Sequence, residues 1–305
     1  MRHRALFAVD VGNTRVKIAR WRGGAASVFQ DGRPCVPDAE RADGSCDLTA
    51  IERWLLESGN RELDSAFWIV SSVNNRKTAR LKTIVERIRK EDSFYLLTLD
   101  DLPLEVEYDY PEKLGIDRAV AAFAGVRMLP QKTPFLAIDV GTAATVDYVD
   151  QSGVFRGGAI LPGPALSAEA LTRKTAALPM LDDPENASLD GRTQSGALTF
   201  PATETNNGIR LGVVYTLVGA IISFYWQTRL SLERQGANPD DLQLVIAGGD
   251  SHATERNLQN YFNDLDANFK CKVPRPRIVV EPRLALYGLA ELANNIDMPK
   301  RKGAS

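Results

Sequence analysis

The sequence predicts an α/β protein made of two similar lobes with a cleft between them. An apolar run, then Asp-Val-Gly, then a second strand-like run occurs twice, and the two aspartates, Asp10 and Asp139, lie 129 residues apart. Between and around these repeats, strand-like runs alternate with segments of helical periodicity. A chain of 305 residues is long for one core and suits two lobes of about 150 residues each. We therefore expect an N-terminal lobe over residues 1–134 and a C-terminal lobe over residues 135–305.

Apolar and alternating runs predict the strands of the first lobe, and apolar residues at helical spacing predict its helices. The expected strands are 5–9, 16–19, 67–70 and 94–99, and the expected helices are 49–58 and 77–90. The stretch 30–47 is rich in Gly, Pro and Asp and predicts a loop. The second lobe begins as the first does, with strands expected over 135–138 and 145–149, and another over 244–247.

One long apolar segment, Ile209–Trp226, raises the alternative of a membrane span. Charged, small and polar residues interrupt it, and it is shorter than the roughly 20 predominantly apolar residues that a span requires. Apolar residues surround the expected helix on more than one face, which predicts burial on all sides. We therefore expect this helix to lie between a lobe core and a partner subunit in a homodimer, with no membrane contact.

Composition excludes several classes of function. The formal net charge is −2, and the one basic cluster, Lys300–Lys302, lies at the C-terminal end, so a nucleic-acid partner is not expected. Three scattered cysteines and two histidines provide neither a zinc cluster nor a disulfide framework. Sparse thiols favour a reducing compartment. The apolar run before Asp10 is too short for a signal peptide, so a cytoplasmic location is expected.

The two Asp-Val-Gly motifs have the chemistry of a phosphate and metal site. Glycine after a buried strand lets the backbone approach a phosphate and offer N–H groups. A carboxylate such as that of Asp10 can bind Mg2+ directly or through water. The further side chains available for phosphate are those of Asn13, Thr14, Lys17 and Thr142. Either motif alone is more often an ordinary strand-to-turn hairpin, but two copies across a cleft would grip both ends of a triphosphate.

Other nucleotide-binding signatures are missing. The P-loop pattern G-x-x-x-x-G-K-(S/T) is not present, and neither is the protein-kinase set of a Gly-rich loop, HRD and DFG. The expected strand 244–247 runs into Gly248-Gly249. These glycines either let an adenine or ribose lie against bare backbone or form a tight turn.

Taken in order, the motifs of this chain resemble those of type III pantothenate kinases, which belong to the actin/Hsp70/sugar-kinase superfamily with ribonuclease H-like lobes. The matching segments are Asp10–Lys17, Tyr110-Pro111, Gly115–Arg118 (G-x-D-R), Asp139–Thr145, Gly157–Gly163 (G-G-x-I-x-P-G) and Gly248-Gly249. The match covers nearly the whole chain. It implies ATP-dependent phosphorylation of pantothenate to 4'-phosphopantothenate, the first step of coenzyme A biosynthesis.

The resemblance also implies roles for individual residues. ATP with Mg2+ would be bound by Asp10, Val11, Gly12, Asn13, Thr14, Arg15, Val16, Lys17, Thr142, Gly248 and Gly249. Pantothenate would be bound by Tyr110, Gly115, Ile116, Asp117 and Arg118, and by Thr205 of a neighbouring subunit. Asp117 would be the general base, Asp10 a Mg2+ ligand and Asp139 a ligand of a monovalent cation, K+ or NH4+.

Three alternatives remain open at this point. Without the resemblance, Asp117 and Arg118 would be expected to cap a helix running from Ala119 to Met128. Another small-molecule kinase of the same superfamily would share the two Asp-Val-Gly hairpins, and a catalytically inactive nucleotide-binding regulator would be expected to lack Asp10 or Asp117. The chain also departs from the family at Glu204-Thr205, where the family usually has Asn-Thr.

Overall fold

The computed structural model describes the chain in two compact units. One unit comprises Met1–Gln131 with Arg283–Ser305, and the other comprises Lys132–Pro282. The residues described are 5–21, 29–30, 33–34, 40–42, 48–56, 65–179, 181, 192–193, 196–197, 200–269 and 273–293. The three cysteines, His3 and Lys300–Lys302 lie outside these residues, so the expectations placed on them are not addressed.

The first unit is built on a mixed five-stranded sheet of order β5-β2-β1-β6-β7. Its strands are β1 (Ala5–Val11), β2 (Val16–Trp21), β5 (Glu40–Ala42), β6 (Ala66–Ser72) and β7 (Ser93–Leu96), and a separate ribbon joins β3 (Phe29–Gln30) to β4 (Arg33–Pro34). β1 pairs antiparallel with β2 and parallel with β6. The prediction of a loop over residues 30–47 is wrong at β5, which pairs with β2.

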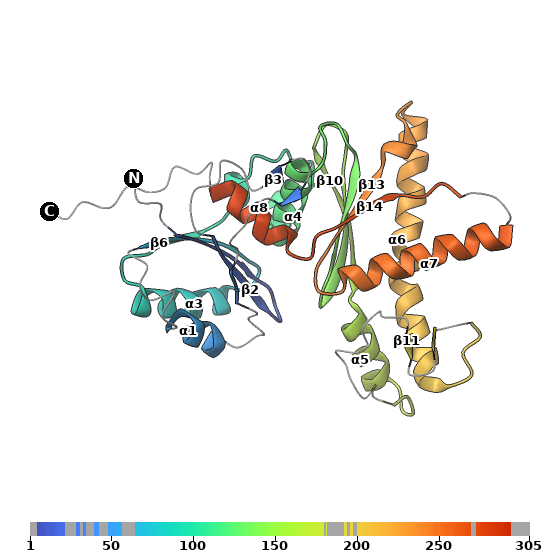
Figure 1. The fold of residues 1–305 in the computed structure, drawn as a ribbon, viewed down its shortest axis with the longest axis horizontal. Coiled ribbons are helices and arrows are strands. Elements are labelled where there is room, and N and C mark those ends of the chain that lie inside the picture. Colours follow the sequence, from blue (N-terminus) through green and yellow to red (C-terminus); the bar gives the residue numbers. More distant parts are fainter. Residues whose placement is uncertain are drawn as a thin grey trace. The chain divides into compact units, whose positions relative to one another are not determined.

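Helices cover both faces of this sheet (Figure 1). They are α1 (Leu48–Leu56), α3 (Asn75–Ile88), α4 (Ile116–Met128) and α8 (Leu284–Ala293), with 3-10 turns η1 (Leu99–Asp101) and η2 (Pro111–Lys113). The apolar stripes of α1 and α3 pack on one face of β1 and β6, in a cluster that includes Phe7, Ile51, Trp68 and Leu81. The helices α4 and α8 pack on each other, and α8 contacts β1, β2 and β6, whereas α4 contacts β6.

The position of α8 corrects the expected lobe boundary, because residues 135–305 do not form a single unit. Gly288 of α8 is so close to α4 that a Cβ there would lie 2.9 Å from Ala124 Cβ. Arg127 of α4 also forms an ion pair with the buried Glu291 of α8 at 2.8 Å. The helix α8 therefore belongs to the first unit, because it packs on α4. Local periodicity in the sequence cannot predict this contact, since the two helices are far apart in the chain.

The second unit repeats the topology of the first, with sheet order β10-β9-β8-β13-β14. Its strands are β8 (Phe135–Val140), β9 (Ala143–Val149), β10 (Phe155–Pro162), β13 (Gln243–Ala247) and β14 (Arg277–Val280), with a small β11 (Arg192–Thr193) and β12 (Gly196–Ala197) ribbon. β8 pairs antiparallel with β9 and parallel with β13, as β1 does with β2 and β6. This shared strand order confirms the predicted α/β class with two similar lobes.

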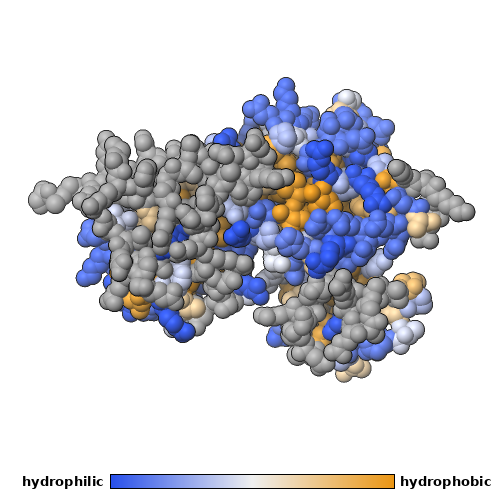
Figure 2. Space-filling model, viewed as in Figure 1, coloured by the Kyte–Doolittle hydropathy of each residue, from blue (hydrophilic) through white to orange (hydrophobic). Residues whose placement is uncertain are grey.

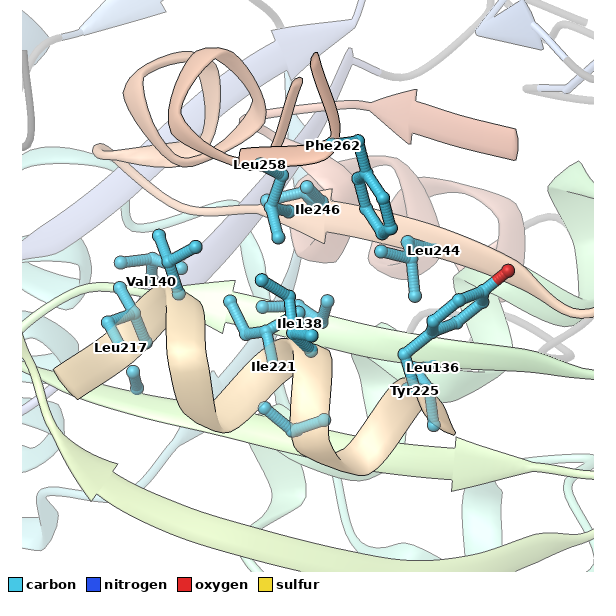
Figure 3. Packing of buried hydrophobic residues seen from close by; sticks show 14 of the residues in the cluster. Leu136, Ile138, Val140, Leu217, Ile221, Tyr225, Leu244, Ile246, Leu258 and Phe262 are labelled. Carbon is cyan, nitrogen blue, oxygen red and sulfur yellow. The ribbon is translucent and has the colours of Figure 1, made fainter. Parts of the chain in front are cut away.

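The helices of the second unit gather on the core around α6. They are α5 (Pro164–Lys174), α6 (Thr205–Arg234) and α7 (Ser251–Phe269), with a 3-10 turn η3 (Pro239–Asp241). Figure 3 shows Leu217, Ile221 and Tyr225 of α6 facing the side chains of β8 and β13, with Leu258 and Phe262 of α7 in the same cluster. Burial of such side chains stabilises the fold by about 1.5–3 kcal/mol each.

The apolar helix α6 is longer than predicted, with 30 residues instead of 18. By length and composition it could cross a membrane, and half of its most apolar window is buried inside this chain. Within this chain one face of α6 stays exposed, at Gly212, Tyr215, Thr216, Gly219 and Ser223, so its expected burial against a partner subunit stays a prediction. In the view of Figure 2 the largest hydrophobic area lies near the centre, smaller ones are scattered, and hydrophilic residues cover most of the remaining described surface.

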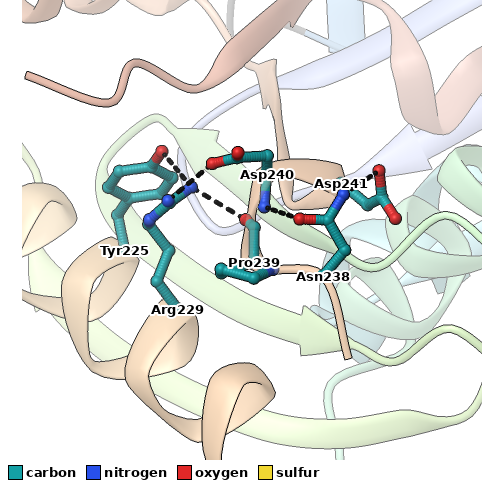
Figure 4. A network of polar contacts seen from close by, with 6 residues as sticks. All are labelled: Tyr225, Arg229, Asn238, Pro239, Asp240 and Asp241. Atoms are coloured by element: carbon teal, nitrogen blue, oxygen red, sulfur yellow. Dashed lines mark hydrogen bonds and ion pairs between the residues drawn. The ribbon is translucent and has the colours of Figure 1, made fainter. Parts of the chain in front are cut away.

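Arg229, in the C-terminal half of α6, forms hydrogen bonds and an ion pair with η3 (Figure 4). Its guanidinium is largely buried and donates to Asp240 Oδ1 at 2.6 Å, to Pro239 O at 2.8 Å and to Tyr225 Oη at 3.1 Å. A buried cation is tolerated only when it is paired and hydrogen bonded. This network therefore fixes the connection between α6 and β13.

Candidate active site

The first Asp-Val-Gly motif forms the hairpin between β1 and β2. Val11 pairs with Val16, so the four residues 12–15 make the loop, and the Gly12 N–H donates to Arg15 O at 2.9 Å. Asn13, Thr14 and Arg15 are exposed. The hairpin therefore presents a polar loop at the carboxyl end of β1, the edge at which α/β sheets commonly bind ligands.

Asp10 lies at the base of this loop and is only 8% exposed. Its Oδ1 accepts a hydrogen bond from Ser71 Oγ of the neighbouring strand β6 at 3.1 Å. Lys17, directly opposite on β2, places its Nζ 3.9 Å from Asp10 Oδ2. The carboxylate is thus held by one neutral donor and one cation, and its charge is partly compensated within the hairpin.

The helix that follows β6 also reaches this loop. Lys77, in the first turn of α3, donates to the backbone oxygens of Asn13 and Thr14. The sequence analysis missed this residue. A sequence signal was present, since a basic side chain in the first turn of a helix opposes the helix dipole and needs a compensating contact.

The second Asp-Val-Gly motif forms the hairpin between β8 and β9, where Val140 pairs with Ala144, so the three residues 141–143 make the loop. The Gly141 N–H donates to Ala143 O at 3.1 Å, and Thr142 O accepts a hydrogen bond from the Gly163 N–H at 3.0 Å. Gly141 and Thr142 are exposed, and Asp139 is half-buried at the end of β8. This loop presents mainly backbone and one hydroxyl group.

Two glycines from distant segments are packed against the second loop. A Cβ at Gly163 would overlap with Gly141 O and lie 2.6 Å from Thr142 O. Gly248 has φ +89°, and a Cβ there would overlap with Val140 O and the carboxylate of Asp139. No described atom lies within 4 Å of a Cβ at Gly249. A tight turn therefore explains why residue 248 is a glycine, but it does not explain the glycine at 249.

The G-G-x-I-x-P-G motif is likewise explained by packing on β9. The pairing of β10 with β9 shifts register between Phe155 and Gly158, and Gly157 within this bulge has φ +92°. A Cβ at Gly158 would overlap with Val146 O of β9. The bulge brings the end of β10 and Gly163 to the second loop.

The G-x-D-R segment begins helix α4, and here one expectation needs correction. The helix starts at Ile116 instead of Ala119, and its N-cap is Gly115, which makes no side-chain cap hydrogen bond. Asp117 is the second residue of the helix, and its Oδ1 accepts the Arg118 N–H at 2.9 Å. Asp117 is therefore not the N-cap, although its carboxylate still contacts the first turn. A Cβ at Gly115 would lie 2.5 Å from Asp117 Oδ1, so a larger residue there would displace this carboxylate.

Tyr110 and Arg118 flank this turn in contrasting environments. The Tyr110 side chain is 58% exposed, and Lys113 Nζ lies 4.5 Å from its ring centroid. Arg118 is buried, with its guanidinium carbon 6.0 Å from the Tyr108 ring centroid. Both predicted substrate residues thus lie on one short stretch of the first unit, separated by η2.

Thr205 is exposed and is the first residue of α6. The preceding Glu204 is the N-cap, and its carboxylate accepts the N–H groups of Asn206 at 2.8 Å and Asn207 at 2.9 Å. These two backbone hydrogen bonds lower the pKa of Glu204 below its ordinary value of 4.5. A charged cap of this kind suits the positive end of the helix dipole.

The predicted residues fall into local groups within the two units. The first unit contains residues 10–17, Tyr110 and residues 115–118, and the second brings Asp139, Thr142 and Gly248 together. Among the described residues, no group of three or more His, Cys, Asp or Glu could hold a metal ion. Mg2+ does not need one, since it often uses one or two carboxylates with substrate phosphates and water.

Two lobes of one topology, each with an Asp-Val-Gly hairpin at the same place in its sheet, define a duplicated α/β protein with two equivalent loops. The family model "Type III pantothenate kinase" matches residues 6–227. The chain therefore belongs to the type III pantothenate kinase family.

Curated relatives agree with this assignment over most of the chain. A type III pantothenate kinase of Rubrobacter xylanophilus is 31% identical over 292 residues, which cover 94% of this chain and 96% of the relative. Another, of Rhodopirellula baltica, is 31% identical over 260 residues, with 80% and 87% covered. Among solved structures, the actin-like protein Alp7A aligns with a TM-score of 0.45 and 12% identity, covering 95% of this chain and 96% of that one.

Proposed function

We propose that this protein transfers the γ-phosphoryl group of ATP to the hydroxyl group of pantothenate, yielding 4'-phosphopantothenate and ADP. Family membership supports this reaction. The single observation that carries it is the pair of exposed Asp-Val-Gly loops at equivalent positions of two sheets with the same strand order. The reaction would belong to coenzyme A biosynthesis in the cytoplasm. Neither another small-molecule kinase nor an inactive regulator accounts as well for the family match, and both Asp10 and Asp117 are present.

The first loop has the groups that phosphate binding requires. Residues 10–17 would hold the phosphates through the backbone of Gly12, the side chains of Asn13 and Thr14, and the cation of Lys17. The buried carboxylate of Asp10 fits Mg2+, a hard cation that prefers oxygen ligands. When bound, Mg2+ bridges phosphate oxygens and neutralises developing charge. Thr142 would bind ATP in the second unit, and the open space at Gly249 suits the adenosine.

Asp117 would act as the general base. Its carboxylate would accept the proton of the pantothenate hydroxyl while that oxygen bonds to the γ-phosphorus and the bond from phosphorus to the β-phosphate oxygen breaks. The helix N-terminus beneath Asp117 and the Arg118 N–H hold the carboxylate in place. Arg118 and Tyr110 would position the substrate, and Arg118 would pair with its carboxylate.

The decisive experiment is an assay of ATP-dependent pantothenate phosphorylation by the wild type and by Asp117→Asn. We expect product with the wild type and a decrease in kcat of roughly 100-fold or more in the variant, because a base contributes about that much. ADP affinity and melting temperature should stay close to those of the wild type, since the amide oxygen can still accept the Arg118 N–H. Near-normal turnover in a folded Asp117→Asn protein would remove Asp117 from the mechanism.

We also propose that Asp139 binds a monovalent cation, K+ or NH4+. Its half-buried carboxylate and the Val140 carbonyl oxygen both lie against Gly248, and such oxygens are the ligands that K+ prefers. The role would be to hold the loop in place instead of taking a proton.

The protein would act as a homodimer in which Thr205 contacts the pantothenate bound by the partner. The exposed face of α6 is rich in small residues that permit close approach of a second helix, and Thr205 begins the same helix. We expect light scattering at micromolar concentration to give twice the chain mass. Replacing Gly219 by Trp should then give a folded monomer, whereas a stable wild-type monomer would contradict the proposal.

A further inference from the structure

Lys77 occupies an electrostatically unfavourable position. It lies in the first turn of α3, where the helix dipole disfavours cations, and the neighbouring Arg76 adds a second positive charge. The local cap does not use its side chain, because Asn74 Oδ1 accepts the backbone N–H of Lys77 at 3.0 Å. The cap therefore leaves the ammonium group to contact another segment.

That segment is the loop between β1 and β2. Lys77 Nζ lies 2.5 Å from Asn13 O and 3.0 Å from Thr14 O, two carbonyl oxygens more than 60 residues away in sequence. Hydrogen bonds from a charged donor are about twice as strong as neutral ones. A further backbone contact, from the Val73 N–H to Val11 O at 3.1 Å, joins the start of α3 to the same hairpin.

The two carbonyl contacts set the direction of two peptide units. In a planar trans peptide, the C=O of one residue and the N–H of the next point to opposite sides. With Asn13 O and Thr14 O turned toward Lys77, the N–H groups of Thr14 and Arg15 are directed away from α3. In a phosphate-binding loop, the direction of the N–H groups determines whether they can meet an anion.

We propose that Lys77 is a positioning residue of the ATP site, holding the peptide planes of residues 13–15 in the orientation that the phosphates require. This inference rests on the proposed function of the loop. The second unit supports it by contrast, because the corresponding carbonyl of Thr142 is held by a backbone N–H, that of Gly163. The first loop depends on a side chain, so its support can be removed without altering the backbone.

The test compares ADP binding by the wild type, Lys77→Met and Lys82→Met, using calorimetry in the absence of pantothenate. Lys82 is the matched control, since it is an exposed lysine of the same helix whose Nζ lies 3.9 Å from Glu86. We expect Lys77→Met to weaken ADP binding roughly tenfold, the size of one charged hydrogen bond. Lys82→Met should leave the dissociation constant within about twofold of the wild type.

Hydrogen exchange provides a readout that a purely structural role would not change. ADP should protect the amides of residues 12–16 in the wild type and in Lys82→Met, and should protect them less in Lys77→Met. A lower melting temperature with unchanged ADP affinity and unchanged protection would overturn the proposal. If Lys77→Met does not fold, Lys77→Gln, which lacks the charge but can donate one hydrogen bond, allows the same comparison.

Failure of this inference can be told apart from failure of the proposed function. A wild type that binds ADP but does not phosphorylate pantothenate would contradict the proposed function, and the ADP comparison would still decide the role of Lys77. A wild type with no measurable ADP affinity would overturn both.

Discussion

The loop after β1 and the loop after β8 occupy the same position in two sheets of the same topology, but they are supported in different ways. The first has four residues, is exposed and polar, and is contacted by the side chain of Lys77, while Ser71 donates to Asp10 at its base. The second has three residues and is contacted by the backbone of Gly163, while Gly248 lies against Val140 and Asp139 at its base. In both, a backbone N–H donates to the Val carbonyl of the motif. In the first unit the Val73 N–H, after β6, donates to Val11 O, and in the second the Asp250 N–H, after β13, donates to Val140 O.

This difference shows which features the repeated fold imposes and which each loop acquires independently. The strand order and the backbone hydrogen bond at the Val carbonyl recur, so they belong to the scaffold. Loop length, side-chain donors and glycine contacts differ, so they are adaptations of each site. We infer that the first loop is specialised for charge and the second for close backbone approach.

The largest expected effect comes from exchanging the two aspartates for asparagine, one at a time. Asp10→Asn should lower kcat/KM for ATP by about 100- to 1,000-fold, because the loss of a carboxylate that binds Mg2+ costs several kcal/mol in the transition state. Asp139→Asn should have a smaller effect, about tenfold, seen as a weaker response to K+ or NH4+. Initial rates measured against Mg2+ and against each monovalent cation separate the two.

A Ser71→Ala variant is the control for Asp10, since it removes the hydrogen bond to the carboxylate and keeps the charge. Equal losses in the two aspartate variants would show that the loops are not specialised as we infer. An unaltered cation response in Asp139→Asn would count against the cation site.

The next largest effect, on stability, should come from adding one methyl group at a glycine of the first loop or at a glycine packed against the second. At Gly163 the new Cβ would overlap with Gly141 O, so Gly163→Ala should cost about 1–3 kcal/mol and displace the second loop. At Gly12 the nearest atom, Arg15 O, would be 3.1 Å from the Cβ, and Gly12→Ala should cost under about 1 kcal/mol. Urea unfolding and the KM for ATP measure both effects, and a larger loss at Gly12 would reverse the comparison.

The smallest expected effect concerns the helix caps of the two units. Asn74, the cap of α3, is neutral, whereas Glu204, the cap of α6, is a carboxylate whose pKa is lowered by its two backbone hydrogen bonds. A lowered folded-state pKa means that the stabilisation is present above the unfolded pKa, near 4.5, and is lost as the pH falls through the folded value. The wild type should therefore lose stability relative to Glu204→Gln as the pH falls below about 4.5.

Melting temperatures of the wild type and Glu204→Gln, followed from neutral pH into acid, would measure this difference. An Asn74→Ala variant should lower stability by a similar amount at every pH, by about 1 kcal/mol, because no ionisation is involved. A pH-independent gap between the wild type and Glu204→Gln would show that the charge of the cap has no role.

Local sequence alone determined the two lobes and the residues of their loops. The apolar runs before Asp10 and Asp139 and the alternation after them predicted β1, β2, β8 and β9 within a few residues, because strand periodicity and glycine turns are local properties. The Asp-Val-Gly repeat predicted the duplication, and the shared strand order confirms it. The family and its reaction class also followed from the motifs, which lie in order along the chain.

Only the tertiary structure decided which distant segments support the loops. The contacts of Lys77 with Asn13 and Thr14, of Gly163 with the second loop, and of α8 with α4 join residues that are far apart in the chain. Periodicity and propensity describe neighbours along the chain, and they carry no information about which side chain meets a given carbonyl group after folding. Packing and hydrogen bonding in the folded state determine these contacts. A buried polar group needs a partner, and a close backbone approach needs a small residue, and the segment that lies beside it after folding supplies them.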